Sequence, residues 1–201
     1  MATFCTDAGH GGKDSGGAWH NVFEKDINLQ YTLALNALLK QRGHQMLTTR
    51  KADHPAPPLA TRYKLINLHH SQNTPRFDAI ISLHCNVSAY KNPASGSYMA
   101  NQSTRGFYTI YNRESIKGRD LASSIANQII KAGITVKNGG KLSTLELGRT
   151  LAWIHKTLPP AVVIELGYLT NFEELTLLKD SEHQEKIITA IADGIENYVL
   201  E

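Results

Sequence analysis

The chain has 201 residues, of which 41% are hydrophobic, 7% aromatic and 19% charged. This composition fits one globular domain over residues 1–201 and excludes a disordered tail, a mini-protein and a coiled coil. The 21 lysine and arginine residues exceed the 18 acidic residues by three, and no basic run is dense enough to indicate a nucleic-acid partner. No apolar run is long enough to cross a bilayer, so we expect no membrane-spanning segment.

Strand-like and helix-like patterns alternate along the chain. Short apolar runs predict strands, and apolar residues that recur every three or four positions predict helices. In chain order the predicted elements are a strand at Thr3–Thr6, a helix at Lys25–Gln41, strands at Gln45–Thr49, Ala79–His84 and Phe107–Tyr111, a helix at Arg119–Ala132, a strand at Ala161–Glu165 and a helix at Glu182–Val199. This alternation predicts an α/β layered domain with a mostly parallel sheet.

Two capping-box patterns mark further helix starts. Asn171 and Glu174 have the spacing that predicts a short helix before the last one. Ser143 and Glu146 have the same spacing, but the following segment Leu151–His155 fits a strand as well as a helix. We leave that segment open.

Side chains capable of metal binding or proton transfer follow three of the predicted strands. The first strand leads into His10, the strand at 79–84 ends on His84, and the strand at 161–165 ends on Glu165. Carboxyl ends of parallel strands lie along one edge of a sheet, and ligands bind at that edge. We therefore expect these three side chains to converge.

Several glycines surround His10, at positions 9, 11, 12, 16 and 17. Their spacing matches neither a Walker A loop nor a dinucleotide-binding fingerprint. Glycines here let the backbone turn tightly after the strand, so that His10 faces the sheet edge. A plain turn with an exposed histidine fits the segment equally well when it is read alone.

Two glutamates have opposite local environments. Glu24 begins a predicted helix, where the amide dipoles favour its ionised form and suit it to be a metal ligand. Glu165 follows four apolar residues, and burial in such a strand raises the pKa of a carboxyl group toward neutrality. Together with His10 and His84, this predicts a hydrolytic zinc site with Glu24 as a ligand and Glu165 as the general base.

The two cysteines, Cys5 and Cys85, are too few and too far apart for a structural zinc site or a disulfide framework. We expect two buried thiols. A metal-free alternative has Cys85 as nucleophile with His84 or His10 as its base. Adjacent strand residues point to opposite faces, so a Cys85–His84 pair has poor geometry for this chemistry.

Four segments together resemble the zinc-dependent N-acetylmuramoyl-L-alanine amidases of the third amidase family. They are Asp7–Asp14, Glu24–Leu29, Ser82–Asn86 and Val163–Asn171, in the order found in that family and spanning most of the chain. Thr49–Arg50 and Leu59–Asn67 are similar to two further segments of the family.

The resemblance implies a peptidoglycan hydrolase that cleaves the amide between the lactyl group of N-acetylmuramic acid and L-alanine. It implies one zinc ion held by His10, Glu24 and His84, and Glu165 as the catalytic glutamate. It also implies a twisted, mixed sheet flanked by helices on both faces. Asn86 and His155 are the expected substrate-binding residues, and a packed or solvent-facing histidine fits position 155 equally well.

The segment 86–106 reads as a polar loop, without the inserted helix that covers the zinc site in some similar enzymes. We therefore expect a constitutively active enzyme with no obligate protein partner. We also expect a monomer. Tyr90, Asn92, Tyr98 and Asn101 are expected to line or cover the substrate groove.

The sequence starts at Met1, close to the first predicted strand, and shows no secretion signal. Such a chain resembles a phage or prophage endolysin, made in the cytoplasm and acting on the cell wall. A bacterial amidase whose targeting region lies outside this sequence is the alternative. Two other functions stay open: a zinc-dependent endopeptidase or carboxypeptidase of the wall, and a non-catalytic wall-binding module.

Overall fold

The computed structural model describes residues 1–72 and 75–200, and its centre is a six-stranded sheet within those residues. The strand order is β4 (Gln45–Thr48), β1 (Thr3–Ala8), β5 (Ala79–Asn86), β10 (Ala161–Tyr168), β8 (Phe107–Tyr111) and β9 (Val136–Ser143). The first four strands are mutually parallel, β8 is antiparallel to β10, and β9 is parallel to β8. The predicted single-domain α/β fold with a mixed, mostly parallel sheet is confirmed.

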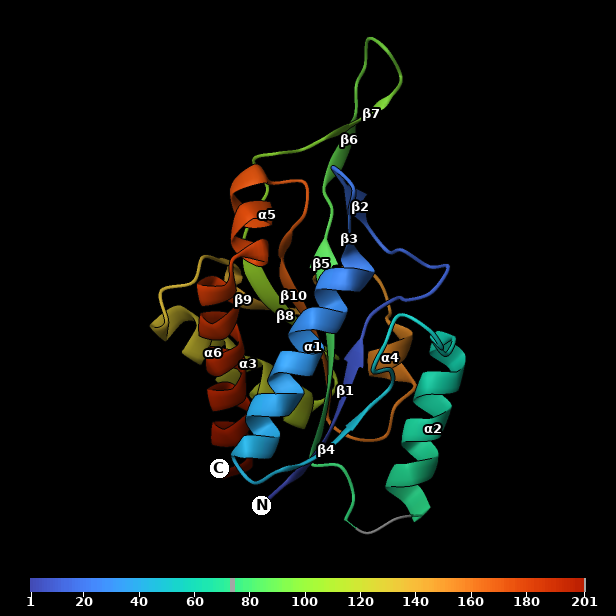
Figure 1. Cartoon of the computed structure of the whole chain (residues 1–201), viewed down its shortest axis with the longest axis vertical. Coiled ribbons are helices and arrows are strands. Elements are labelled where there is room, and N and C mark those ends of the chain that lie inside the picture. Colours follow the sequence, from blue (N-terminus) through green and yellow to red (C-terminus); the bar gives the residue numbers. More distant parts are fainter. Residues whose placement is uncertain (73–74, 201) are drawn as a thin grey trace.

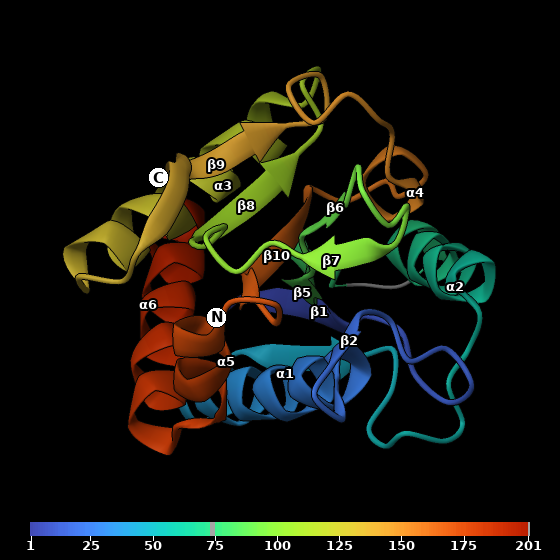
Figure 2. The same ribbon diagram turned by 90° about the horizontal axis from the view of Figure 1, so that it is seen from above.

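Helices cover both faces of this sheet (Figures 1 and 2). On one face α6 (Ser181–Leu200) packs between α1 (Glu24–Gln41) and α3 (Ile116–Lys131). On the other lie α2 (Leu59–Gln72) and α4 (Ala152–His155), while α5 (Phe172–Lys179) follows β10. Among the residues that the structure describes, none of the helices is both long and apolar enough to span a bilayer.

Side chains along the central strands point alternately to the two faces of the sheet, and this divides the hydrophobic core into two clusters. On β5, Ile81 and Leu83 face the cluster under α1, α3 and α6, whereas Ile80 faces the cluster under α2 and α4. On β10, Ile164 and Val163 divide in the same way. Side chains of successive strand residues point to opposite faces, so this packing fixes which face each polar residue at a strand end presents.

Two elements, β9 and α2, differ from the sequence-based expectations. No strand was predicted at β9, where Asn138 and the two glycines after it have positive φ and interrupt the apolar pattern. Helix α2 buries only Arg62 and Ile66 among its described residues, which leaves no amphipathic periodicity to recognise. The open segment 151–155 contains the helix α4. At α5 the prediction is confirmed, because the Asn171 side chain accepts a hydrogen bond from the Glu174 N–H.

The segment 86–106, expected to be a polar loop, contains a hairpin of β6 (Ala89–Lys91) and β7 (Tyr98–Ala100) that projects beyond the sheet (Figure 1). A second small ribbon, β2 (Ala18–Trp19) and β3 (Val22–Phe23), precedes α1. In the hairpin Tyr90 and Tyr98 are exposed. The two strands of this hairpin have three residues each and are joined by a polar turn. They are therefore too short to produce a strand pattern in the sequence.

The contact between α3 and α6 depends on the absence of a side chain at Gly194. A Cβ there would lie 2.5 Å from Cα and 2.9 Å from N of Ile125. We expect Gly194→Ala to reduce the free energy of unfolding by about 1–3 kcal/mol, because the helices must separate. Urea denaturation measures this. Glu185→Ala on the exposed face of α6 is the matched control, and an equal effect of both substitutions would contradict the close-packing argument.

Candidate metal centre

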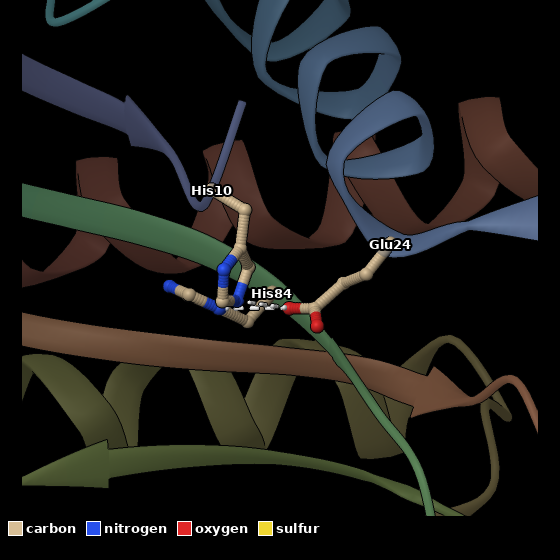
Figure 3. Close-up of side chains that lie close together, drawn as sticks. All are labelled: His10, Glu24 and His84. Carbon is tan, nitrogen blue, oxygen red and sulfur yellow. Dashed lines mark hydrogen bonds and ion pairs between the residues drawn. The ribbon is translucent and has the colours of Figure 1, made fainter. Parts of the chain in front are cut away.

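Three side chains from separate elements meet at one end of the sheet (Figure 3). His10 lies in the turn after β1, Glu24 is the first residue of α1, and His84 lies near the end of β5. One donor atom from each lies within 4.8 Å of the other two. Oε1 of Glu24 is 2.8 Å from Nδ1 of His84 and 3.2 Å from Nε2 of His10. The fold thus brings together the three residues predicted as metal ligands.

Glu24 is buried and surrounded by hydrogen-bond donors. Its Oε1 accepts from Asn28 Nδ2 and from the Cys85 N–H, and its Oε2 accepts from the Gly17 N–H at 2.7 Å. Burial opposes ionisation, but hydrogen bonds from His10 and His84 outweigh it and hold the pKa of Glu24 well below its usual range. The carboxylate is therefore ionised and concentrates negative charge between the two imidazoles.

His10 is oriented by its backbone and by a second carboxylate. Its φ of 63° is uncommon for a residue other than glycine. Nδ1 of His10 lies 2.8 Å from Oδ2 of Asp14, so an Nδ1–H donor to that carboxylate leaves Nε2 directed at Glu24. Burial lowers the pKa of His10, but its bonds to Glu24 and Asp14 outweigh burial and raise the pKa to about 9. Asp14 was not singled out from the sequence, although its spacing of four from His10 was the available signal.

Glycines leave room for the three side chains. A Cβ on Gly9 would lie 2.2 Å from Cε1 of His84, and a Cβ on Gly16 would lie 2.6 Å from both Oε2 of Glu24 and Cδ2 of His10. Gly16 also has a φ of +63°. These glycines are needed for close approach to the donors, which extends the turn-forming role predicted from the sequence.

Two buried arginines hold the backbone of the turn that carries His10. Arg62 donates to the carbonyls of Ala8 at 2.8 Å and His10 at 2.6 Å. Arg50 donates to the carbonyls of Ala8 at 3.0 Å and Gly9 at 3.1 Å. Charge-assisted bonds to consecutive carbonyls fix the path of this turn, so both arginines position His10 through its backbone.

Glu165 lies beside the three donors on β10. It is opposite His84 in the parallel pairing with β5 and opposite Tyr108 in the antiparallel pairing with β8. It is buried, and its Oε2 has no hydrogen-bond partner within the described part of the chain. Burial raises the pKa of Glu165 to about 7, and the neighbouring His84 limits the rise. The structure thus places an unpaired carboxyl group, able to exchange a proton near neutral pH, next to the candidate metal ligands.

A cavity of about 850 Å³ joins these groups, and His10 and His84 are 27% and 24% exposed. Asn86 lines this cavity and donates from Nδ2 to the Tyr108 hydroxyl at 2.6 Å. His155 is not among the lining residues, and its Nδ1 lies 2.9 Å from the Leu151 carbonyl oxygen. Arg149, which was not singled out from the sequence, lines the cavity instead.

Four side chains in or next to the hairpin also lie outside the cavity lining, namely Tyr90, Asn92, Tyr98 and Asn101. That they cover a bound substrate stays a prediction. The sequence places them near His84 along the chain, but the hairpin carries them outward.

Both cysteines are buried free thiols, as predicted. Cys85 packs in the core under α1, α3 and α6, on the face opposite His84. Burial raises the pKa of the Cys85 thiol well above its usual value, and Glu24 adds to the effect. The thiol is therefore protonated at neutral pH and poorly suited to act as a nucleophile.

The chain is similar in sequence and in structure to known amidases. The model of the N-acetylmuramoyl-L-alanine amidase family matches residues 5–197. YqiI of Bacillus subtilis strain 168 is 32% identical over 196 residues, covering 98% of this chain and 84% of YqiI.

Two solved structures are also similar over nearly their whole lengths. The amidase AmiC2 of Nostoc punctiforme is 28% identical with a TM-score of 0.81, covering 100% of this chain and 98% of that one. The CwlD amidase of Clostridioides difficile, solved in complex with the GerS lipoprotein, is 26% identical with a TM-score of 0.78, covering 100% and 99%. With nearly all of its length matched by the family model, this chain belongs to the N-acetylmuramoyl-L-alanine amidase family.

Proposed function

We propose that this enzyme is a zinc-dependent peptidoglycan hydrolase that cleaves the amide between the lactyl group of N-acetylmuramic acid and L-alanine. The observation that carries the proposal is the group of His10, Glu24 and His84 beside the buried, unpartnered carboxyl group of Glu165. Family membership supports the peptidoglycan substrate.

The donor set fits zinc. Two imidazoles and one carboxylate are the ligands of many catalytic zinc sites, which keep one position open. The negative charge of Glu24 between the two rings also favours a cation there, and Asp14 orients His10 as a partner outside the ligand set should. When bound, zinc would supply Lewis acidity to polarise the amide carbonyl and to acidify water.

Glu165 supplies the proton transfers in this proposal. Its free Oε2 accepts a proton from the attacking water and then donates it to the departing alanine amine. A pKa near 7 suits both transfers, because neither protonation state is strongly favoured at neutral pH. Asn86 lines the cavity close by and is proposed as a substrate contact.

Two alternative functions remain, and the residues of the site bear on each. A wall endopeptidase or carboxypeptidase would keep the metal and Glu165 but cut within the peptide. A non-catalytic wall-binding module has no use for an unpartnered buried carboxyl group, which reduces the stability of the fold. Glu165 therefore favours an enzyme.

Digestion of purified peptidoglycan tests the proposal. We expect the chain alone to release intact stem peptides that begin with a free alanine amine, as identified by mass spectrometry. Chelation should abolish release and added Zn²⁺ should restore it. Fragments cut inside the stem would assign an endopeptidase, and release that resists chelation would exclude the proposed metal dependence.

The same assay tests the proposal that no obligate protein partner is needed, because it uses the purified chain alone. The monomeric state stays a prediction. The CwlD amidase was solved in a complex with a lipoprotein, so turnover by this chain alone is the decisive comparison.

The assignment as an endolysin stays a prediction. The endolysin assignment would be supported if cells that express the chain in the cytoplasm lyse only after their inner membrane is permeabilised.

A further inference from the structure

Arg149 presents an unpaired positive charge to the cavity. It lies between β9 and α4 and lines the same cavity as Glu165. Within residues 1–72 and 75–200, no hydrogen bond or ion pair engages its guanidinium group. Arg50 and Arg62 also lie near the site, but backbone carbonyls occupy their guanidinium groups. Arg149 is therefore available to a ligand.

The backbone that carries Arg149 is held in place. Its N–H donates to the Thr144 carbonyl at 3.3 Å. In the same loop the Ser143 hydroxyl donates to Glu146 at 2.6 Å. Leu147 and Leu151, two residues to either side of Arg149, pack against the core under α2 and α4. The guanidinium group is thus attached to a fixed segment, which reduces the entropy lost when it binds a partner.

Arg149 acts on Glu165 without pairing with it. The positive charge of Arg149 lowers the pKa of Glu165, although burial prevails. No ion pair joins the two groups, so they are more than 4.0 Å apart. Glu165 is thus not engaged in an ion pair with Arg149, and both side chains line the one cavity where part of a substrate can contact them.

We propose that Arg149 forms a subsite for a carboxylate of the stem peptide. The inference rests on the proposed function and names the part of the substrate that the cavity selects. The lactyl carboxyl group is consumed in the scissile amide, so the free carboxylates near the reacting bond belong to the peptide side. An arginine can hold a carboxylate through two parallel hydrogen bonds, which a neutral carboxamide cannot match.

Matched muramyl peptides test the subsite. Two substrates of the form N-acetylmuramoyl-L-alanyl-X are compared, in which X has either a free carboxylate or the corresponding carboxamide. We expect the wild type to prefer the carboxylate by about 10-fold or more in kcat/KM, mainly through KM. Arg149→Gln should lower cleavage of the carboxylate substrate to the level of the carboxamide, while Arg149→Lys keeps part of the preference.

Arg113→Gln is the matched control, because Arg113 is an exposed arginine outside this cavity. It should leave the preference unchanged. Equal cleavage of both substrates by the wild type, or an equal loss on both in Arg149→Gln, would overturn the subsite.

Binding of the same pair to Glu165→Gln separates this inference from the proposed function. Calorimetry should show tighter binding of the carboxylate, and Arg149→Gln in that background should remove the difference. If the wild type cleaves neither substrate, the proposed function fails, and the binding data still decide the subsite. Equal binding of both peptides would reject it.

Discussion

Replacing Glu165 with glutamine is expected to reduce hydrolysis by about 100- to 10,000-fold, the usual contribution of a general acid or base. Glutamine keeps the shape of the side chain but cannot accept the water proton. Because His10, Glu24 and His84 are unchanged, binding of Zn²⁺ should stay within a few fold of the wild type. Release of stem peptides and a competitive zinc titration measure the two properties separately.

The same substitution is expected to stabilise the metal-free protein. Burial raises the pKa of Glu165 from its usual 4.5 to about 7, so the ionised form is disfavoured in the fold. The loss of stability is fully present above pH 7 and disappears as the pH falls to about 4.5, where the carboxyl group is protonated in both folded and unfolded chains. At pH 8 the buried carboxylate of Glu165 reduces the free energy of unfolding by about 3 kcal/mol.

Thermal denaturation of the chelated proteins at pH 8 and pH 4.5 tests this sign. Glu165→Gln should unfold at a temperature several degrees above the wild type at pH 8, and the difference should shrink at pH 4.5. Glu185→Gln, which changes an exposed carboxylate on α6, should show no comparable difference. Retained hydrolysis, or a difference that does not depend on pH, would contradict the role assigned to Glu165.

Gly9→Ala is expected to weaken binding of Zn²⁺ by about 100-fold or more and to abolish activity with it. The new Cβ would lie 2.2 Å from Cε1, 2.4 Å from Nε2 and 2.7 Å from Nδ1 of His84, so the imidazole must move away from Glu24. Gly9 does not have a positive φ, so alanine would not be forced into the left-handed region there. The expected effect is therefore on the position of His84 rather than on the turn.

Zinc affinity by chelator competition, with circular dichroism as the measure of folding, tests this prediction. Gly167→Ala is the matched control near the end of β10, since the nearest atom to its Cβ would be Oε2 of Glu174, at 3.3 Å. It should retain zinc affinity. Wild-type affinity in Gly9→Ala would show that His84 does not hold the ion from its observed position.

The sequence was informative where chemistry follows regular structure. His84 and Glu165 were identified because each ends an apolar run, and parallel pairing of β5 and β10 brings them opposite each other. Glu24 begins a helix, which suits it to be a metal ligand, but its prediction as one rests on the combination with His10 and His84. In each case a local pattern determines where the side chain emerges, and the strand-end rule determines that they meet.

Residues whose roles depend on non-local backbone contacts were harder to predict. Arg62 lies on a helix without an apolar stripe, and the carbonyls of Ala8 and His10 that it holds are more than 50 positions away. Arg149 lies in the loop before α4, and His155 is the last residue of that helix. Only the path of the loop decides that Arg149, and not His155, lines the cavity. Sequence patterns give residue types along a segment but not the direction of an irregular chain.

The order of the donors along the chain has a consequence for assembly. His84 follows Glu24 by 60 residues, so a short stretch of unfolded chain cannot gather the set as a zinc finger does. The turn after β1, the start of α1 and the end of β5 must be in place first. An ion at 100 times its dissociation constant would then add about 2.7 kcal/mol to the stability of the whole domain. Metal binding would thus distinguish folded from misfolded copies, because misfolded copies would bind no metal and would not hydrolyse the cell wall.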